Sequence, residues 1–406
     1  MDEASEKNIR TEEKMIGNDT RTISSAKLGL AALTWAHFLN DGYINYLPAV
    51  LPVLLEEFHI PLALVGSLIL ALQGIGSLLQ PLIGWRADRT GGRSFVLVGL
   101  GMSALGASLI GLAPGYWPLI GLLTIAGLGS AAFHPQALAS VRAIIGTREG
   151  MTMSFFLIGG ELGRGIWPIV AGLLVMWLGL HSLWLFAIPG VLTLLVLARF
   201  TPNLPSEPSQ AVRSAWEINR GPILALIGFV GLRGMVSYGV VTFVPLLWHA
   251  HGGSLIGGAS LISVMLVVGI LGNFFGGVLA DRIGRRPVIV GSSLFSALLL
   301  ALFLFSQGLW LWVSLAFLGI AVFATAPVTI LIGQDLFPKS HSMASGIALG
   351  AGNALGAVAI FALGFVADYY GIDASLWWIV GLSLLGLPLA LILPEGSGRT
   401  SALSGA

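Results

Sequence analysis

Long runs of apolar residues recur along almost the whole chain, and short breaks carrying glycine, proline or charge separate them. About 20 apolar residues in a helix cross the roughly 30 Å hydrocarbon core of a bilayer. The pattern therefore predicts an all-α membrane protein with twelve transmembrane helices, near residues 28–55, 61–85, 94–113, 117–143, 150–178, 181–200, 221–249, 254–280, 287–306, 309–333, 341–366 and 374–394.

Polar segments mark the ends and the middle of this pattern. Residues 1–26 are charge-dense and have no apolar core, so we interpret them as a disordered cytoplasmic tail and not as a signal peptide. Residues 201–220 form the longest polar break inside the apolar region and predict a cytoplasmic linker. The linker divides the chain into two six-helix bundles, 27–200 and 221–394, with a second cytoplasmic tail at 395–406.

Composition agrees with membrane insertion. The chain is 56% hydrophobic and 10% charged, whereas an ordinary soluble domain is about a quarter charged. A soluble protein this apolar would expose large hydrophobic patches and aggregate. Because the chain has no cysteine, disulfides, thiol nucleophiles and thiolate metal sites are excluded.

The basic residues lie on one side of the predicted membrane. Eighteen of the 20 lysines and arginines fall in the N-terminal tail, in alternate breaks or after the last span. The opposite breaks hold Glu56, Glu57, Asp368 and Asp373 but no lysine or arginine. Because positive charge accumulates in cytoplasmic loops, both termini are predicted to be cytoplasmic in a multi-pass protein of the cell membrane.

An internal repeat relates the two predicted bundles. The stretch from Gly84 to Arg93 contains Asp88, and a similar stretch from Gly277 to Arg286 contains Asp281, 193 residues later (281 minus 88). Pro135 and Pro327 lie at matching places of the fourth and tenth spans, 192 residues apart (327 minus 135). Such a duplication predicts two parallel halves related by an axis along the membrane normal.

The repeated pattern Gly-x-x-x-Asp-Arg-x-Gly-x-Arg resembles the signature loop of the major facilitator superfamily, and the resemblance covers about residues 28–394. It implies alternating access and a cytoplasmic gating latch. A carboxylate near the positive N-terminus of a neighbouring helix is stabilised there, which suits such a latch. The other interpretation is that these charges only anchor the loops. The residues assigned to the latch are Gly84, Asp88, Arg89, Gly91, Arg93, Gly277, Asp281, Arg282, Gly284, Arg285 and Arg286.

A narrower resemblance lies in the first half. The stretches His37-Phe-Leu-Asn40-Asp41-Gly42 and Phe133-His134-Pro135 are similar to the fosmidomycin-resistance branch of these transporters. That resemblance implies export of a drug in exchange for protons.

Four charged residues fall near the middle of predicted spans: Asp41, Glu161, Arg164 and Arg233. A charge at the bilayer centre costs about 3 kcal/mol on insertion scales, so such residues are functional candidates. At 1.5 Å per helical residue, all four lie roughly 17 to 21 Å from the cytoplasmic ends of their spans. We therefore expect them to meet at one level, where the resemblance places the solute cavity.

Asp41 is the predicted proton carrier. His37 precedes it by four residues and shares its helix face, so the two side chains can exchange a proton. Burial favours the neutral form of a carboxylate and lets it load and unload protons. In the alternative interpretation, Asp41 is a helix-packing hydrogen-bond group beside Asn40, and His37 is a packing residue. Glu161 is a further candidate for proton coupling.

Glu161 and Arg164 lie three residues apart in a glycine-rich stretch, 159–165, which resembles the fifth-helix motif of antiporters. They form either a mutually neutralising pair or part of the solute site. The resistance branch usually carries neutral residues here, so this departure suggests a substrate with its own charge. When Asp41 is protonated, the four midplane residues carry a net positive charge, which suits an anionic solute. Arg233 then binds that anion. In the alternative interpretation, Arg233 pairs permanently with Asp41 or Glu161.

The predicted solute cavity is lined by Asn40, Arg164, Arg233, His134, Tyr238 and Asn353. Gln73, Gln136 and Asp335 are weaker candidates, which face either the cavity or the latch. Pro135 interrupts the helical hydrogen bonds beside His134, which favours a position at the cavity.

The sequence thus predicts a secondary transporter that exports a small amphipathic or anionic compound in exchange for protons. Proton symport into the cell is the alternative, because Asp41 would drive either direction. A membrane-embedded enzyme is disfavoured, since the seven histidines show no metal cluster along the sequence. We expect a monomer with a small-molecule substrate, protons as coupling ion and lipid around it, and no cofactor, metal or nucleic acid.

Overall fold

We describe the protein from a computed structural model, which describes residues 27–90, 93–144, 149–201, 220–336 and 350–395. Within these ranges every regular element is a helix. Among the described residues, ten helical segments are long and apolar enough to cross a membrane, and Arg93–Ser108 is a shorter apolar helix at the predicted third span. The predicted first span consists of two helices. The all-α fold class is therefore confirmed.

The N-terminal bundle is built in chain order from a helix at 27–45, α2 (Leu47–Glu57), η1 (Leu62–Leu64), α3 (Val65–Ile69), the π-helical turn η2 (Leu70–Gly74), α4 (Ile75–Thr90), α5 (Arg93–Ser108), η3 (Ile110–Leu112), α6 (Tyr116–Ile144), α7 (Glu149–Leu178), η4 (Leu180–Phe186) and α8 (Ala187–Phe200).

The C-terminal bundle is built from α9 (Arg220–Ala250), α10 (Leu255–Ile283), α11 (Arg285–Phe305), α12 (Trp310–Phe323), α13 (Thr325–Leu336), α15 (Gly352–Tyr370), α16 (Ile372–Ser383) and α17 (Gly386–Ile392). The predicted tails, most of the predicted linker and the start of the predicted eleventh span lie outside the described residues.

The first span is interrupted where Tyr46 separates helix 27–45 from α2. Pro48 stands in the first turn of α2 and has no backbone N–H, so it cannot bond to the carbonyl one turn earlier. The chain continues in nearly the same direction, because the Tyr46 N–H still donates to the Gly42 carbonyl at 3.2 Å. The break lies one turn beyond Asp41, at the level of the predicted cavity.

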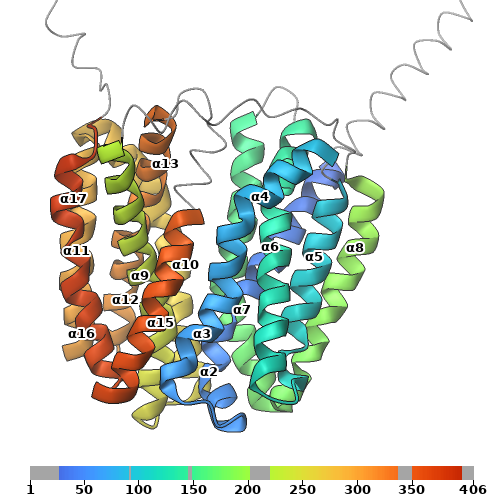
Figure 1. The fold of residues 1–406 in the computed structure, drawn as a ribbon, viewed down its shortest axis with the longest axis horizontal. Helices are drawn as coiled ribbons and strands as arrows, with labels where there is room; N and C mark the ends of the chain where they lie inside the picture. Colours follow the sequence, from blue (N-terminus) through green and yellow to red (C-terminus); the bar gives the residue numbers. More distant parts are fainter. Residues whose placement is uncertain (1–26, 91–92, 145–148, 202–219, 337–349, 396–406) are drawn as a thin grey trace, which may run out of the picture.

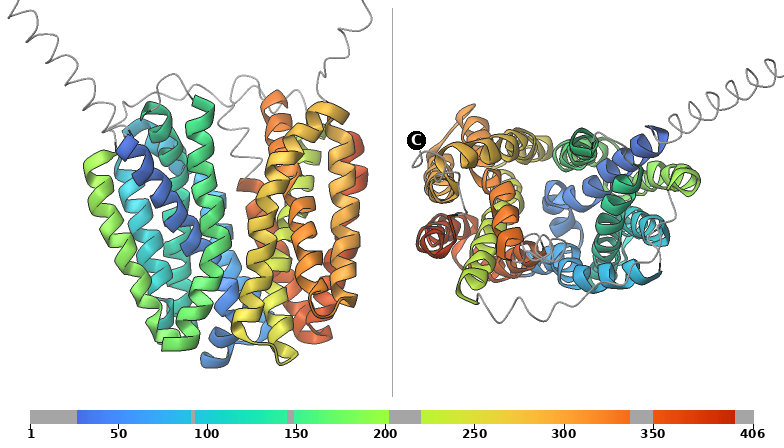
Figure 2. Two further views of the ribbon diagram at one scale, coloured as in Figure 1. Left: turned by 180° about the vertical axis from the view of Figure 1, so that it is seen from behind. Right: turned by 90° about the horizontal axis from the view of Figure 1, so that it is seen from above.

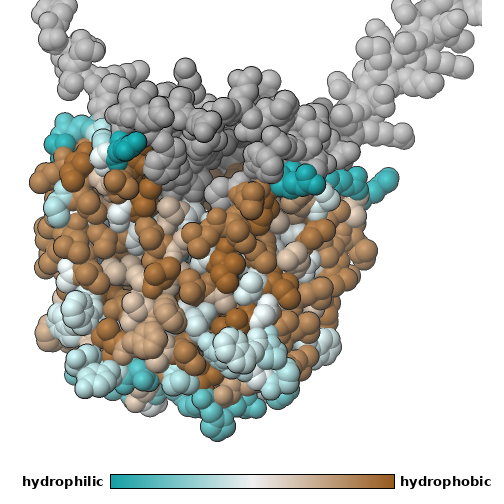
Figure 3. Space-filling view, viewed as in Figure 1, coloured by the Kyte–Doolittle hydropathy of each residue, from teal (hydrophilic) through white to brown (hydrophobic). Residues whose placement is uncertain are grey.

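The two bundles stand side by side, and their helices run roughly parallel to one another (Figures 1 and 2). Helix 27–45 begins, and α17 ends, at the same face of the molecule, which we call the terminal face; α2 ends at the opposite face (Figure 1). Figure 3 shows a broad apolar belt with hydrophilic residues at both rims. This is the surface expected of a protein whose middle faces lipid tails.

Contacts at the terminal face follow the internal repeat. The Arg93 guanidinium donates to the carbonyl of Ala198 at the end of α8. In the other bundle, Arg286 donates to the carbonyl of Leu391 near the end of α17 at 3.2 Å. Both the donors and the acceptors are 193 residues apart (286 minus 93, and 391 minus 198), so the two halves repeat this contact. An arginine near the negative C-terminal end of a helix is stabilised there.

At the opposite face the two bundles pack against each other. Helix α2 contacts α9, and η1 with α3 contacts α15. Gly66 of α3 lies against the backbone of Phe361, so a side chain at this position would separate the helices. Glu56 and His249 form a 2.8 Å ion pair between α2 and α9 and are separated by 193 residues. Because repeat-related positions touch only near the axis that relates them, this pair lies at the centre of the contact.

Candidate functional site

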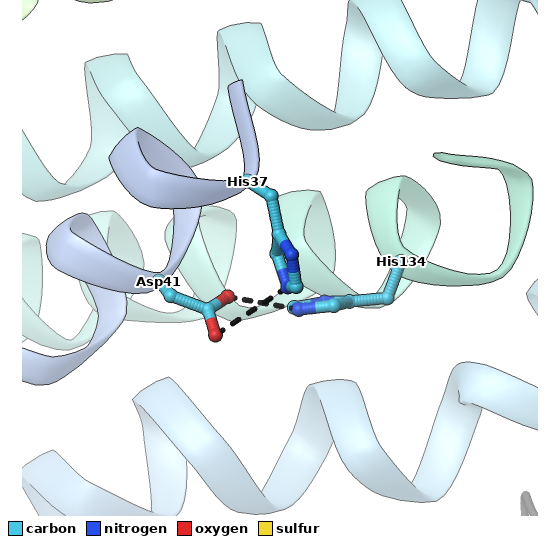
Figure 4. A group of neighbouring side chains, drawn as sticks. All are labelled: His37, Asp41 and His134. Carbon is cyan, nitrogen blue, oxygen red and sulfur yellow. Dashed lines mark hydrogen bonds and ion pairs between the residues drawn. The ribbon is translucent and has the colours of Figure 1, made fainter. Parts of the chain in front are cut away.

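Three ionisable side chains meet inside the N-terminal bundle. Asp41 and His37 come from helix 27–45, and His134 comes from α6 (Figure 4). The Nε2 atom of His134 lies 2.8 Å from Asp41 Oδ1, and that of His37 lies 3.6 Å from Asp41 Oδ2. The predicted pairing of Asp41 with His37 is therefore the longer contact, and His134 is the hydrogen-bonded partner.

Packing fixes the His37 ring. The ring stacks on Phe156 of α7 with centroids 4.2 Å apart, and its Nδ1 atom lies 2.8 Å from the Phe156 carbonyl oxygen. Gly160 faces the ring from one turn further along α7, where any side chain would collide with it. The glycine at this place in the 159–165 stretch thus makes room for a histidine as well as for close helix packing.

The hydrogen bonds of the two imidazoles show where protons reside. Nδ1 of His37 faces the Phe156 carbonyl, and Nδ1 of His134 faces the Ser130 carbonyl at 2.9 Å. Because a carbonyl oxygen only accepts, both Nδ1 atoms carry hydrogen. In a neutral imidazole the remaining nitrogen, Nε2, is then a bare acceptor, as are the oxygens of an ionised carboxylate. The 2.8 Å contact between His134 and Asp41 therefore requires a proton between them.

The same three ligand atoms lie within 4.8 Å of one another, a spacing that a divalent cation would also accept. The sequence showed no such grouping of histidines, since His134 is 97 residues from His37 (134 minus 37). The 2.8 Å contact between His134 and Asp41 is also the length of a direct hydrogen bond, which needs no cation.

Asn40 supports the carboxylate from its own helix. Its side-chain amide donates to Ser130 Oγ at 3.0 Å and to Asp41 Oδ1 at 3.3 Å. Asn40 is fully buried, so it positions Asp41 and Ser130 and does not present a free surface to a solute. Ser130 was not among the predicted site residues, because a serine in an apolar span carries no distinguishing pattern.

A second charged group stands on α7 and reaches toward the other bundle. Arg164 Nη1 donates to both oxygens of Glu161, at 3.1 and 3.2 Å. Asn273 of α10 donates to Glu161 at 3.4 Å, and the Arg164 guanidinium lies 5.3 Å from the centre of the Phe323 ring of α12. Arg164 is also near enough for its charge to act on Asp41. Glu161 and Arg164 are thus a neutralising pair that lies at the junction of both halves.

Tyr238 makes another link between the halves. Its hydroxyl donates to the side chain of Gln73 at 3.4 Å, and Gln73 donates in turn to the Ile44 carbonyl at 3.3 Å. Gln73 belongs to the π-helical turn η2. Such turns often occur at functional sites because they shift side chains out of the regular helical register.

Arg233 and Asn353 are the remaining predicted cavity residues. Neither forms a hydrogen bond or ion pair with another described residue, and the Nε atom of Arg233 is buried without a partner. Arg233 therefore does not pair with Asp41 or Glu161. Within the described part of the chain, it is a charge at membrane depth that no carboxylate neutralises.

A sequence model described as the Major Facilitator Superfamily matches residues 33–269 and, again, residues 225–405. The chain belongs to this superfamily. The first match runs from the first half into the second, and the second match covers nearly all of the second half. The protein is accordingly a multi-pass membrane transporter, as the twofold loop pattern predicted.

Relatives cover nearly the whole chain. An uncharacterized MFS-type transporter, YfnC of Bacillus subtilis (strain 168), is 29% identical over 375 residues, or 88% of this chain and 91% of that protein. The fosmidomycin resistance protein of Escherichia coli (strain K12) is 26% identical over 380 residues, or 90% and 92%. The predicted resemblance to the fosmidomycin-resistance branch is confirmed.

Solved structures share the fold at low sequence identity. The nucleoside transporter NupG superposes with a TM-score of 0.79 at 16% identity, covering 91% of this chain and all of that one. A bacterial homolog of the human lysosomal transporter Spinster gives a TM-score of 0.70 at 17% identity, covering 91% and 93%. These likenesses confirm the major facilitator fold.

The two loops that carry the repeated Gly-x-x-x-Asp-Arg-x-Gly-x-Arg pattern lie at the terminal face. In the second loop, Asp281, Arg282 and Gly277 belong to α10, and Gly284 stands between α10 and α11 with a φ of 92°, a conformation that favours glycine. Arg285 pairs with Asp335 of α13 at 2.5 Å. In the first loop, Gly84, Asp88 and Arg89 belong to α4, but their side chains and Gly91 lie outside what the structure describes. The latch role stays a prediction.

Proposed function

We propose that the protein is a proton-coupled transporter that exports a small amphipathic or anionic compound by alternating access, with both termini in the cytoplasm. The 2.8 Å contact between His134 and Asp41 carries this proposal, because an imidazole and a carboxylate at that distance can share a proton. Secondary transport follows from the family, and the name of the Escherichia coli relative supports drug efflux. In this scheme, Asp41 and His134 load a proton in one orientation of the halves and release it in the other.

The charge of the site supports an anionic solute. Asp41 and Glu161 balance Arg164 and Arg233, so the proton shared with His134 leaves one net positive charge. In a medium of low dielectric, an uncompensated charge attracts an opposite one strongly. The carboxylate or phosphate group of an amphipathic compound would find Arg164 at the junction of the halves.

The direct test uses purified protein in liposomes with an imposed pH gradient and a panel of labelled solutes. Export by exchange with protons predicts that solute moves toward the more acidic compartment, against the direction of proton flow. EDTA in every sample excludes metal binding at the histidines. Transport that is unaffected by the gradient for every solute would contradict proton coupling.

Symport of a small organic anion is a second candidate, and the net positive charge of the protonated site favours it specifically. A proton on the site raises its affinity for an anion, and by reciprocity the anion raises its affinity for the proton. Binding of both together is the requirement for cotransport. In the same liposomes, accumulation in the more alkaline compartment would select symport over export.

We expect Asp281→Asn to slow turnover several-fold while solute affinity stays nearly unchanged. Asp281 lies at the terminal-face end of α10, whereas α10 packs against the α7 neighbourhood of Arg164 earlier in its length, at Val267. The charge of Asp281 therefore affects the balance between the two orientations and not the solute. Calorimetry gives the affinity and liposome flux gives the turnover. Glu395→Gln, which removes an ion pair of the same face with Arg286, is the matched control. Weakened binding with normal turnover would refute a gating role.

We expect the contact between α2 and α9 to open during each cycle. The chain has no cysteine, so Glu56→Cys and His249→Cys together provide a unique pair of thiols. A short thiol-reactive cross-linker should abolish transport, and a reducible linker should restore it after reduction. Each single cysteine variant, treated in the same way, should remain active. Full transport by the cross-linked protein would show that this contact does not separate.

A further inference from the structure

A small, largely apolar cavity lies inside the C-terminal bundle, apart from the histidine site. Arg233 and Val236 of α9 line it together with Ser292, Ser293 and Ser296 of α11 and Ser383 of α16. It has room for about one water-sized particle. The cavity is thus too small for an organic solute, yet four serines and an arginine are among the residues that border it.

The internal repeat suggests how the space for this cavity arises. Position 43 in the N-terminal bundle corresponds to Val236, and Gly190 corresponds to Ser383, 193 residues later in both cases. In the N-terminal bundle, the buried Tyr43 ring packs toward Gly190, and its hydroxyl donates to the Phe186 carbonyl at 2.7 Å. The smaller valine of the C-terminal bundle leaves the corresponding space open.

The charge of this cavity is uncompensated. Arg233 has no ion-pair or hydrogen-bond partner among the described residues, and its Nε atom is buried. Glu161, whose charge acts on Arg233, is already engaged by Arg164. A cation at membrane depth without a counter-charge is costly, and water does not neutralise it.

One of the four hydroxyl groups is available as a donor to an anion. Ser292, Ser293 and Ser383 donate to backbone carbonyls at 2.6, 3.1 and 2.7 Å. Ser296 forms no hydrogen bond with a described residue, so its hydroxyl hydrogen is free to donate. Arg233 and Ser296 therefore present donors to the same small space.

We infer that this cavity binds a single small inorganic anion of halide size, held by Arg233 and Ser296 in the solute-free protein. The anion neutralises Arg233 and stabilises the packing of α9 against α11 and α16. Because the site is separate from the histidines and the test needs no solute, this inference stands whether or not the proposed proton coupling holds. An anionic solute at Arg164 would compete with the halide through the shared positive field.

The test compares thermal unfolding in sodium chloride, sodium bromide and sodium gluconate at equal ionic strength. Gluconate is too large for the cavity. We expect the unfolding midpoint to rise with halide concentration by about 1 to 3 °C over gluconate. Crystals grown in bromide should show an anomalous peak between Arg233 and Ser296.

Two variants separate the site from general salt effects. Arg233→Gln removes the charge, and Val236→Tyr fills the cavity with the residue of the other half while keeping Arg233. Both should abolish the halide effect, and Arg164→Gln should retain it. Equal midpoints in halide and gluconate with no anomalous peak would show water only and overturn the inference. A halide effect that persists in Val236→Tyr would place the anion elsewhere and overturn it equally.

Discussion

Asp41→Asn should abolish accumulation of solute driven by a pH gradient, reducing it to the level reached without a gradient. The amide cannot take up or release a proton, so the exchange between Asp41 and His134 is lost. Exchange of labelled solute without a gradient should persist, because the amide has nearly the same shape and its N–H groups donate to the bare Nε2 of His134. Both fluxes are measured in the same liposome preparation.

The histidines provide an internal ranking for this prediction. His134→Gln should impair coupling more than His37→Gln, because the Asp41 contact is 2.8 Å for His134 and 3.6 Å for His37. Glu161→Gln is the decisive comparison, since Glu161 lies at the same level on α7. If Asp41→Asn retains full proton-driven accumulation while Glu161→Gln loses it, the proton carrier is Glu161 and the role given to Asp41 is wrong.

Arg164→Ala should weaken binding of an anionic solute by roughly 10- to 150-fold, the loss of a charge-assisted hydrogen bond of about 1.5–3 kcal/mol. The substitution also leaves Glu161 without its partner, which adds repulsion of an anion. Arg233→Ala should weaken the same binding through the loss of positive charge. Neutral solutes should be affected much less by either change. Equilibrium binding to purified protein measures both classes.

A charge-balanced double variant tests whether Arg164 acts through contact or only through Glu161. In Glu161→Gln with Arg164→Ala, the unpaired carboxylate is absent, so any remaining loss of affinity reports the contact between Arg164 and the solute. Recovery of full affinity in the double variant would mean that Arg164 only neutralises Glu161. The solute would then have to be bound elsewhere.

The sequence by itself determined the class of protein and its internal repeat. Apolar runs of bilayer length leave the chain few alternatives, because in lipid every backbone polar group must be satisfied within a helix. The loops around Asp88 and Asp281 then identified two equivalent halves and the superfamily. Periodicity also placed Asp41, Glu161, Arg164 and Arg233 within spans. These results need only local properties of the chain.

Only the tertiary structure decided which of these groups meet. His134 becomes the partner of Asp41 because α6 presents that face to helix 27–45, and helix rotation is not encoded in an apolar span whose residues are hydrophobic on every side. The same limit hid Ser130 and Asn273 and left Gln73 only a weaker candidate, because their roles depend on neighbouring helices. Only the structure showed that Arg233, predicted for the central cavity, also borders a small cavity of its own bundle, beside a valine that stands where the other half has Tyr43.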